Sequence, residues 1–209
     1  MVLDLGCGNG HHLLALAPEV ARGIGIDVSP GMIALARARL RNSAWKANLT
    51  FEVGSAEELN AIAEQSIDLA ICIGAFEHML DKRAMLASVY RGLKSGGRFF
   101  CLTPNADYVW YRTIAPVLGY GTKHLSTDRI LTQEEFSVLL DQAGFRRIRS
   151  VPWTFIPKGD VPALVALLLT ILDVIGRHAR LDSFRGGLSL CRLEGGETYL
   201  AAKGMAVMK

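Results

Sequence analysis

A glycine-rich turn near the start of the chain restricts its fold more than any other feature. Residues 4–10 read Asp-Leu-Gly-Cys-Gly-Asn-Gly, directly after the apolar pair Val2 and Leu3. Glycines at alternate positions permit a sharp turn and let the backbone approach a ligand closely. Because residues 11–17 have a helical pattern, the turn joins a strand to a helix. Such crossings at the carboxyl ends of strands are where open α/β sheets bind ligands.

The spacing of the glycines argues against a dinucleotide. A dinucleotide-binding turn has the spacing Gly-x-Gly-x-x-Gly, in which the sixth residue is a glycine. Here the sixth residue is His11 when counted from Gly6 and Leu13 when counted from Gly8. A nicotinamide-dependent oxidoreductase therefore stays only as a weak alternative, kept open by the acidic residue that ends the second strand.

That acidic residue, Asp27, ends the strand expected at 22–27. Its carboxylate can accept hydrogen bonds from both hydroxyls of a ribose, and Asp4 can face an ammonium group near the turn. S-Adenosylmethionine is a ligand that carries a ribose at one end and a zwitterionic amino acid at the other. No diphosphate has to be bound, so the last glycine need not open a helix onto phosphate.

Several later segments, together with this turn, resemble the class I S-adenosylmethionine-dependent methyltransferases, in their small-molecule group called methyltransferase type 11. The matching segments, in the family's order, are 2–10, 25–32, 51–59, 67–72 with 76–78, and 93–100 with 103–105. This set covers roughly residues 1–150 and is more specific than any single motif. One departure is Ser55, where the family often has Asp, so adenine recognition would use backbone groups of Ser55 and Ala56, or Glu57.

The resemblance implies that S-adenosylmethionine is the cofactor and that S-adenosylhomocysteine is the product. The residues assigned to the cofactor, from the turn and from the resemblance, are Asp4, Gly6, Cys7, Gly8, Gly10, Asp27, Val28, Met32, Ser55, Ala56, Glu57 and Ile73. No metal-binding spacing is present, because His11 and His12 are adjacent and the cysteines lie far apart.

Strands and helices alternate along the chain, which predicts a Rossmann-like, doubly wound three-layer α/β sandwich. With the resemblance, this implies a mostly parallel seven-stranded sheet with an antiparallel last strand. The expected strands are 1–4, 22–27, 49–53, 67–73, 97–102, 145–151 and 197–203. The expected helices are 11–17, 30–40, 56–63 and 81–93, followed by one that a capping box opens at Thr132 and that ends at Gly144.

The whole chain, 1–209, is expected to be a single class I methyltransferase domain. Segments 104–131 and 152–190 are interpreted as insertions on the substrate side. The helix that usually precedes the first strand in this family is absent from the sequence, which we interpret as a missing start or as an open cofactor site.

Catalysis in this family needs little from the protein. In-line displacement at an electrophilic methyl group requires a nucleophile held at attack distance and freed of water. A general base is needed only if the acceptor must lose a proton early. In the family that the sequence resembles, the turn after the fourth strand faces the methyl group, so His78 in this turn is the first candidate for a general base. His124, in a loop on the acceptor side, is the second candidate. Both also fit structural roles, His78 as a brace of its turn and His124 as an exposed loop residue.

The acceptor is expected to be a small molecule. Residues 73–76 lack the Asn/Asp-Pro-Pro-Tyr/Phe motif of many enzymes that methylate DNA adenine or protein glutamine. The pattern instead resembles quinone-biosynthesis and natural-product methyltransferases. The segment 161–175 contains a run, 163–172, that is hydrophobic on every face, but it is too short for a comfortable membrane span, and Arg177, His178 and Arg180 follow it. This segment indicates membrane-surface or lipid contact, with an oligomer contact or a buried insertion as the alternative.

Charge and cysteine usage restrict the remaining possibilities. The net charge of +3 gives no support for a nucleic-acid partner. Four separated cysteines and no visible signal peptide favour the cytoplasm, with a peripheral membrane location as an extension. A non-catalytic methyltransferase-like partner protein is the main alternative to an enzyme.

Overall fold

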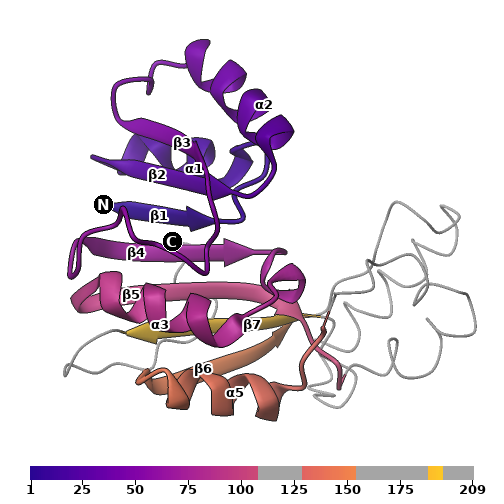
Figure 1. The fold of residues 1–209 in the computed structure, drawn as a ribbon. Helices are drawn as coiled ribbons and strands as arrows, with labels where there is room; N and C mark the ends of the chain where they lie inside the picture. Colours follow the sequence, from indigo (N-terminus) through magenta and orange to yellow (C-terminus); the bar gives the residue numbers. More distant parts are fainter. Residues whose placement is uncertain (108–128, 154–187, 195–209) are drawn as a thin grey trace, which may run out of the picture.

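The computed structural model describes residues 1–107, 129–153 and 188–194. Within these ranges seven strands form one sheet in the order β3-β2-β1-β4-β5-β7-β6 (Figure 1). Strands β1 to β5 pair in parallel with their neighbours, whereas β7 is antiparallel to both β5 and β6. The strands are β1 Val2–Leu5, β2 Gly23–Asp27, β3 Leu49–Val53, β4 Ile67–Ile73, β5 Leu93–Pro104, β6 Arg146–Trp153 and β7 Leu188–Glu194. The Rossmann-like, mostly parallel sheet with an antiparallel last strand is therefore confirmed.

Side chains cap the amino ends of α2, α3 and α5. The helices of the described residues are α1 His11–Leu16, η1 Ala17–Glu19, α2 Pro30–Arg41, η2 Phe76–His78, α3 Lys82–Gly92 and α5 Gln133–Gln142. The side chains of Ser29 and Asp81 accept backbone N–H groups in the first turns of α2 and α3. Thr132 and Glu135 form the complete capping box of α5, and Gly144 follows this helix with a φ of 95°.

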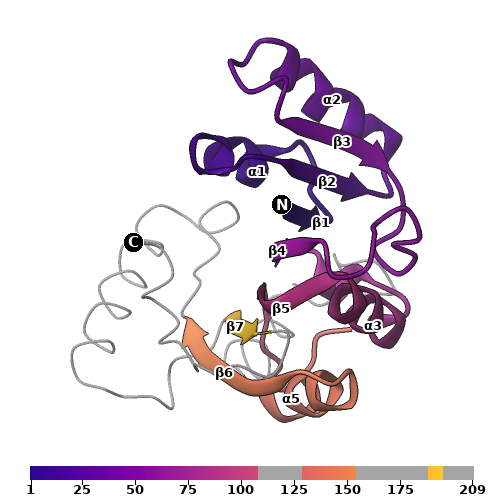
Figure 2. The same ribbon diagram turned by 90° about the vertical axis from the view of Figure 1, so that its left-hand side faces the viewer.

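Helices cover both faces of the sheet and create two separate cores. One core packs α1 and α2 on the sheet through residues that include Leu13, Ile33 and Phe51. The other is larger and joins α3, α5 and the segment after β3 to the opposite face, through residues that include Met85 and Phe136. Figure 2 views the sheet along its edge, with α1 on one side and α3 on the other. This is the three-layer, doubly wound arrangement that alternating strands and helices predict.

The prediction of a helix at 56–63 was wrong. The segment instead contains isolated turns, with N–H to carbonyl bonds from Glu58 to Ser55 and from Ile62 to Leu59. Side chains of α3 take the carbonyl groups that a helix would use: Ser88 donates to the carbonyl of Glu57, and Arg91 to that of Leu59. The apolar spacing of this segment comes from burial against α3 and not from helical periodicity.

The last strand was also misplaced in the sequence analysis. The antiparallel strand beside β5 is β7, Leu188–Glu194, whereas residues 197–203 lie outside the described residues. The first three residues of β7 fall inside the segment 152–190 that the sequence analysis expects to be an insertion. Strand β6 runs to Trp153 and β7 begins at Leu188, so both ends of the segment expected at 152–190 belong to the sheet.

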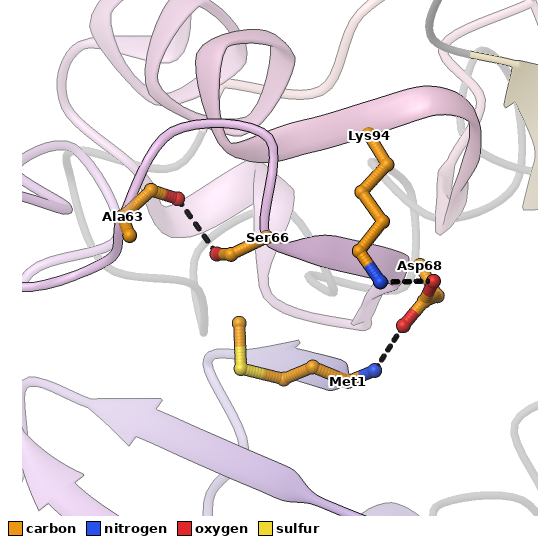
Figure 3. A network of polar contacts seen from close by, with 5 residues as sticks. All are labelled: Met1, Ala63, Ser66, Asp68 and Lys94. Carbon is orange, nitrogen blue, oxygen red and sulfur yellow. Dashed lines mark hydrogen bonds and ion pairs between the residues drawn. The ribbon is translucent and has the colours of Figure 1, made fainter.

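Polar contacts hold the amino ends of three neighbouring strands together (Figure 3). Asp68, near the start of β4, accepts hydrogen bonds from Lys94 of β5, at 2.8 Å, and from the amino group of Met1, which precedes β1. These two cations lower the pKa of the Asp68 carboxyl below its ordinary value, the contact with Lys94 most of all. This cluster lies at the amino ends of the strands, and so leaves their carboxyl ends to the ligand.

Candidate cofactor and active site

The glycine-rich turn follows β1 and leaves its middle residue open. The φ values of Gly6, Gly8 and Gly10 are 67°, 52° and 77°, a backbone conformation that residues with a side chain rarely adopt. A Cβ at Gly6 would lie 2.3 Å from the Cβ of Ala75, whereas a Cβ at Gly8 would meet no atom within 4 Å. Gly6 therefore serves the packing of two loops, and Gly8 presents bare backbone to an open space.

A second open glycine lies in the loop after β4. Gly74 has a φ of 62°, and a Cβ built on it would also meet no atom within 4 Å. Strands β1 and β4 are neighbours, and the contact between Gly6 and Ala75 brings their loops together. Half-buried Ile73 ends β4 beside this loop. Two loops therefore meet at the carboxyl edge of the sheet, and each leaves a glycine facing an opening where a doubly wound fold binds its ligand.

Asp27 at the end of β2 holds the turn in place. Its Oδ2 accepts the backbone N–H of Gly8 and its Oδ1 that of Ser29, both at 2.8 Å. Each carboxylate oxygen keeps a lone pair for a further donor, such as a hydroxyl group. Beside it, Val28 and Met32 leave apolar side chains in solvent, 71% and 44% exposed. This edge of the sheet thus presents a polar surface from Asp27 and an apolar surface from Val28 and Met32.

Asp4 is the buried acid of this site. It is 1% exposed, and among the described residues its Oδ2 has no hydrogen-bond partner. Burial, and secondly the charge of Asp27, raise the pKa of Asp4 to about 7, while the N–H of Leu13 acts in the opposite direction. Cys7, also buried, has a thiol pKa that burial raises, and it packs against the turn as an apolar side chain. A buried carboxyl oxygen without a partner, the Oδ2 of Asp4, is suited to a cationic ligand group.

The segment after β3 places Ser55 and Ala56 beside this edge, but it directs Glu57 elsewhere. The Oγ of Ser55 accepts the N–H of Glu57 at 3.1 Å, and Ala56 is buried. The carboxylate of Glu57 accepts the backbone N–H groups of Leu80 and Asp81, at the start of α3. The Oε1 of Glu57 is therefore engaged at the start of α3, and the adenine contact expected from the backbone of Ser55 and Ala56 stays a prediction.

The turn after β4 contains a buried acid, Glu77, that is not among the site residues expected from the sequence. Glu77, 8% exposed, accepts the Oγ1 hydroxyl of Thr103 from the end of β5 at 3.2 Å. The Nε2 of His78 lies 4.0 Å from Oε1 of Glu77, and the imidazole is about half exposed. The only sequence signal for Glu77 is its place before His78 in the segment 76–78. His124 lies outside the described residues.

A groove of about 610 Å³ opens next to this turn, between the first residues of α3 and α5. Its apolar lining includes Met79, Leu131 and Leu139, and the ion pair between Arg129 and Glu135 lies at its rim.

Within residues 1–107, 129–153 and 188–194, no helix has the length and apolar character needed to cross a membrane.

Comparison with known proteins places these features in one family. The sheet order, the glycine-rich turn and the acid at the end of β2 define the fold as that of a class I methyltransferase. The family described as a methyltransferase domain matches residues 1–143. The chain therefore belongs to the methyltransferase-domain family, and the resemblance seen in the sequence is confirmed.

Its relatives include enzymes of quinone biosynthesis. A demethylmenaquinone methyltransferase of Symbiobacterium thermophilum is 30% identical over 131 residues, covering 57% of this chain and 52% of the relative. The uncharacterized methyltransferase YcgJ of Bacillus subtilis is 30% identical over 161 residues, covering 77% and 60%. The chain thus spans somewhat more than half the length of these relatives. The crystal structure of YcgJ superposes with a TM-score of 0.61 at 24% identity, covering 94% of this chain and 92% of YcgJ, which supports the fold.

Proposed function

We propose that this protein transfers a methyl group from S-adenosylmethionine to a small, lipophilic acceptor. The observation that carries the proposal is the meeting of Asp4, Asp27 and the open backbone at Gly8 and Gly74 at one edge of the sheet. The unpartnered Oδ2 of Asp4 fits an ammonium group, Asp27 fits the ribose hydroxyls, and the space at both glycines fits a chain lying against the backbone. When bound, S-adenosylmethionine supplies an electrophilic methyl group on a sulfonium.

The protein's part in the reaction is to bind, orient and exclude water. Asp27 and the glycine-rich turn fix the ribose end of the cofactor. Asp4, once its carboxyl group has lost its proton, neutralises the ammonium end. The loop of Ile73 and Gly74 faces the reacting centre and limits its access to water. His78 can accept a proton from an acceptor hydroxyl, and the neighbouring Glu77 carboxylate stabilises the imidazolium that results. His124 remains a second candidate for this role.

The acceptor class follows from the relatives and from the sequence. The name of the Symbiobacterium thermophilum protein specifies demethylmenaquinone, a lipophilic aromatic acceptor. Residues 161–175 supply an apolar segment that would meet such a molecule or a membrane surface. We extend the proposal to a cytoplasmic protein that contacts membranes peripherally, and flotation with liposomes tests this extension separately.

Binding and turnover together test the proposal. Calorimetry with S-adenosylhomocysteine should show saturable binding. Incubation with methyl-labelled S-adenosylmethionine and a panel of quinol, phenol and lipid acceptors should transfer label to at least one of them. Binding without transfer to any acceptor would favour a non-catalytic methyltransferase-like partner protein. Lack of binding to S-adenosylhomocysteine would refute the proposal.

A further inference from the structure

Glu57 connects the segment after β3 to the start of α3. Its Oε1 accepts the backbone N–H of Leu80 at 2.8 Å and that of Asp81 at 3.1 Å. From within α3, the hydroxyl of Ser88 donates to the backbone carbonyl of Glu57 at 3.1 Å. A carboxylate at this position also interacts favourably with the helix dipole. One side chain therefore fixes the entry into a helix that begins more than twenty residues later in the sequence.

The other end of this connection lies beside the proposed adenine site. The N–H of Glu57 donates to the Oγ of Ser55 at 3.1 Å, and Ala56 between them is buried. Ser55 and Ala56, the two residues before Glu57, are those whose backbone would contact adenine in the proposed site. A ligand that orders Ser55 and Ala56 must therefore also order the backbone from which the Glu57 side chain extends.

From α3 the contacts continue to the turn that carries His78. The first residue of the helix, Lys82, is buried, and its Nζ donates to the carbonyls of Glu77 at 3.0 Å and of Met79 at 2.8 Å. Glu77 in turn accepts the hydroxyl of Thr103 at the end of β5. The start of α3 is thus hydrogen-bonded to Glu57 through its backbone and to η2 through Lys82.

We propose that Glu57 is a positioning residue that couples occupation of the adenine end of the cofactor site to the placement of residues 76–81, including His78. The proposal rests on the proposed function, because it takes Ser55 and Ala56 as the adenine contacts. Glu57 acts through the backbone of Leu80 and Asp81 and does not touch the reacting atoms. Its role is to hold residues 76–81 in place and to transmit the added order of a filled cofactor site to them.

Hydrogen exchange of the full chain, measured by mass spectrometry with and without saturating S-adenosylhomocysteine, tests this coupling. In the parent protein the ligand should slow exchange in peptides covering 76–81 by at least about fivefold, a modest coupling for two sites. Glu57→Ala should lose this ligand-dependent protection. Glu57→Gln should recover part of it, because its amide oxygen still accepts an N–H group. Glu58→Ala is the matched control, since the neighbouring Glu58 is exposed, and it should behave as the parent does.

The outcomes separate this proposal from the function on which it rests. If the parent does not bind S-adenosylhomocysteine, both proposals fail. If the parent binds it and Glu57→Ala keeps the full protection at 76–81, only the coupling is refuted. If Glu57→Ala does not fold, Glu57→Asp replaces it in the test, because the shorter side chain cannot reach both N–H groups. Loss of the ligand-dependent protection at 76–81 in this variant supports the coupling, and full protection refutes it.

Discussion

Replacing the buried acid of the site, Asp4→Asn, should stabilise the protein at neutral pH while weakening its binding of S-adenosylhomocysteine. Burial raises the pKa of Asp4 from 3.8 to about 7. At about 1.36 kcal/mol for each pKa unit, the ionised carboxylate destabilises the folded state by about 4 kcal/mol relative to the neutral acid. Asparagine keeps the shape and removes the charge, so the variant should not carry this cost.

The sign of the pH dependence follows from proton binding. Between pH 4 and 7 the folded protein holds a proton on Asp4 that the unfolded chain has released, so stability falls as pH rises. The stability associated with the neutral acid is complete below pH 4 and is lost as pH rises through about 7. The difference in the free energy of unfolding between variant and parent should therefore grow from pH 4 to pH 7 and then level off.

Urea denaturation of both proteins at pH 4.5, 6 and 8 measures this difference. Asp68→Asn is the control, because the pKa of Asp68 is lowered and its stabilisation is lost as pH falls, the opposite trend. Asp68 is half exposed, so screening limits its effect to about 1 kcal/mol or less. Parallel stability curves for Asp4→Asn and the parent would refute the assignment of a strained buried acid.

Three further changes test other parts of the structure. Gly8→Val should abolish binding of S-adenosylhomocysteine in calorimetry while circular dichroism shows a folded protein, destabilised by about 1–2 kcal/mol through its positive φ; retained affinity would mean that the turn does not contact the ligand. Asp27→Ala should weaken the same binding by about 1.5–3 kcal/mol, the range for a lost hydrogen bond to a charged group, and an unchanged isotherm would contradict its role. Thr132→Ala should lower the unfolding free energy by about 1 kcal/mol, since it removes the cap of α5, with no change in ligand affinity.

Local signals in the sequence predicted most of the sheet and the loops at its carboxyl edge. The glycine-rich turn, Asp27 at a strand end and the cap at Thr132 depend on residues within a few positions of one another. Their conformation follows from steric and hydrogen-bonding rules that act along the chain. These are the features on which sequence and structure agree.

The remaining features depend on contacts between distant residues. The segment 56–63 forms no helix because side chains of α3, about thirty residues later, take its carbonyl groups. The pairing of Glu77 with Thr103 requires the register that sets Ile73 opposite Leu102 in the sheet. Periodicity carries no information about either contact, so the hydrogen bonds of the Glu57 side chain and the burial of Glu77 are visible only in three dimensions.

The contrast between the two glycines of the turn has a consequence for separating binding from folding. A Cβ at Gly6 collides with the neighbouring loop, whereas one at Gly8 meets no atom within 4 Å. In the proposed function, a substitution at Gly8 would therefore remove the ligand while its cost to folding stays limited to the positive φ. Binding and folding would then be separable at this one position, and a variant there would serve as a folded, non-binding reference protein.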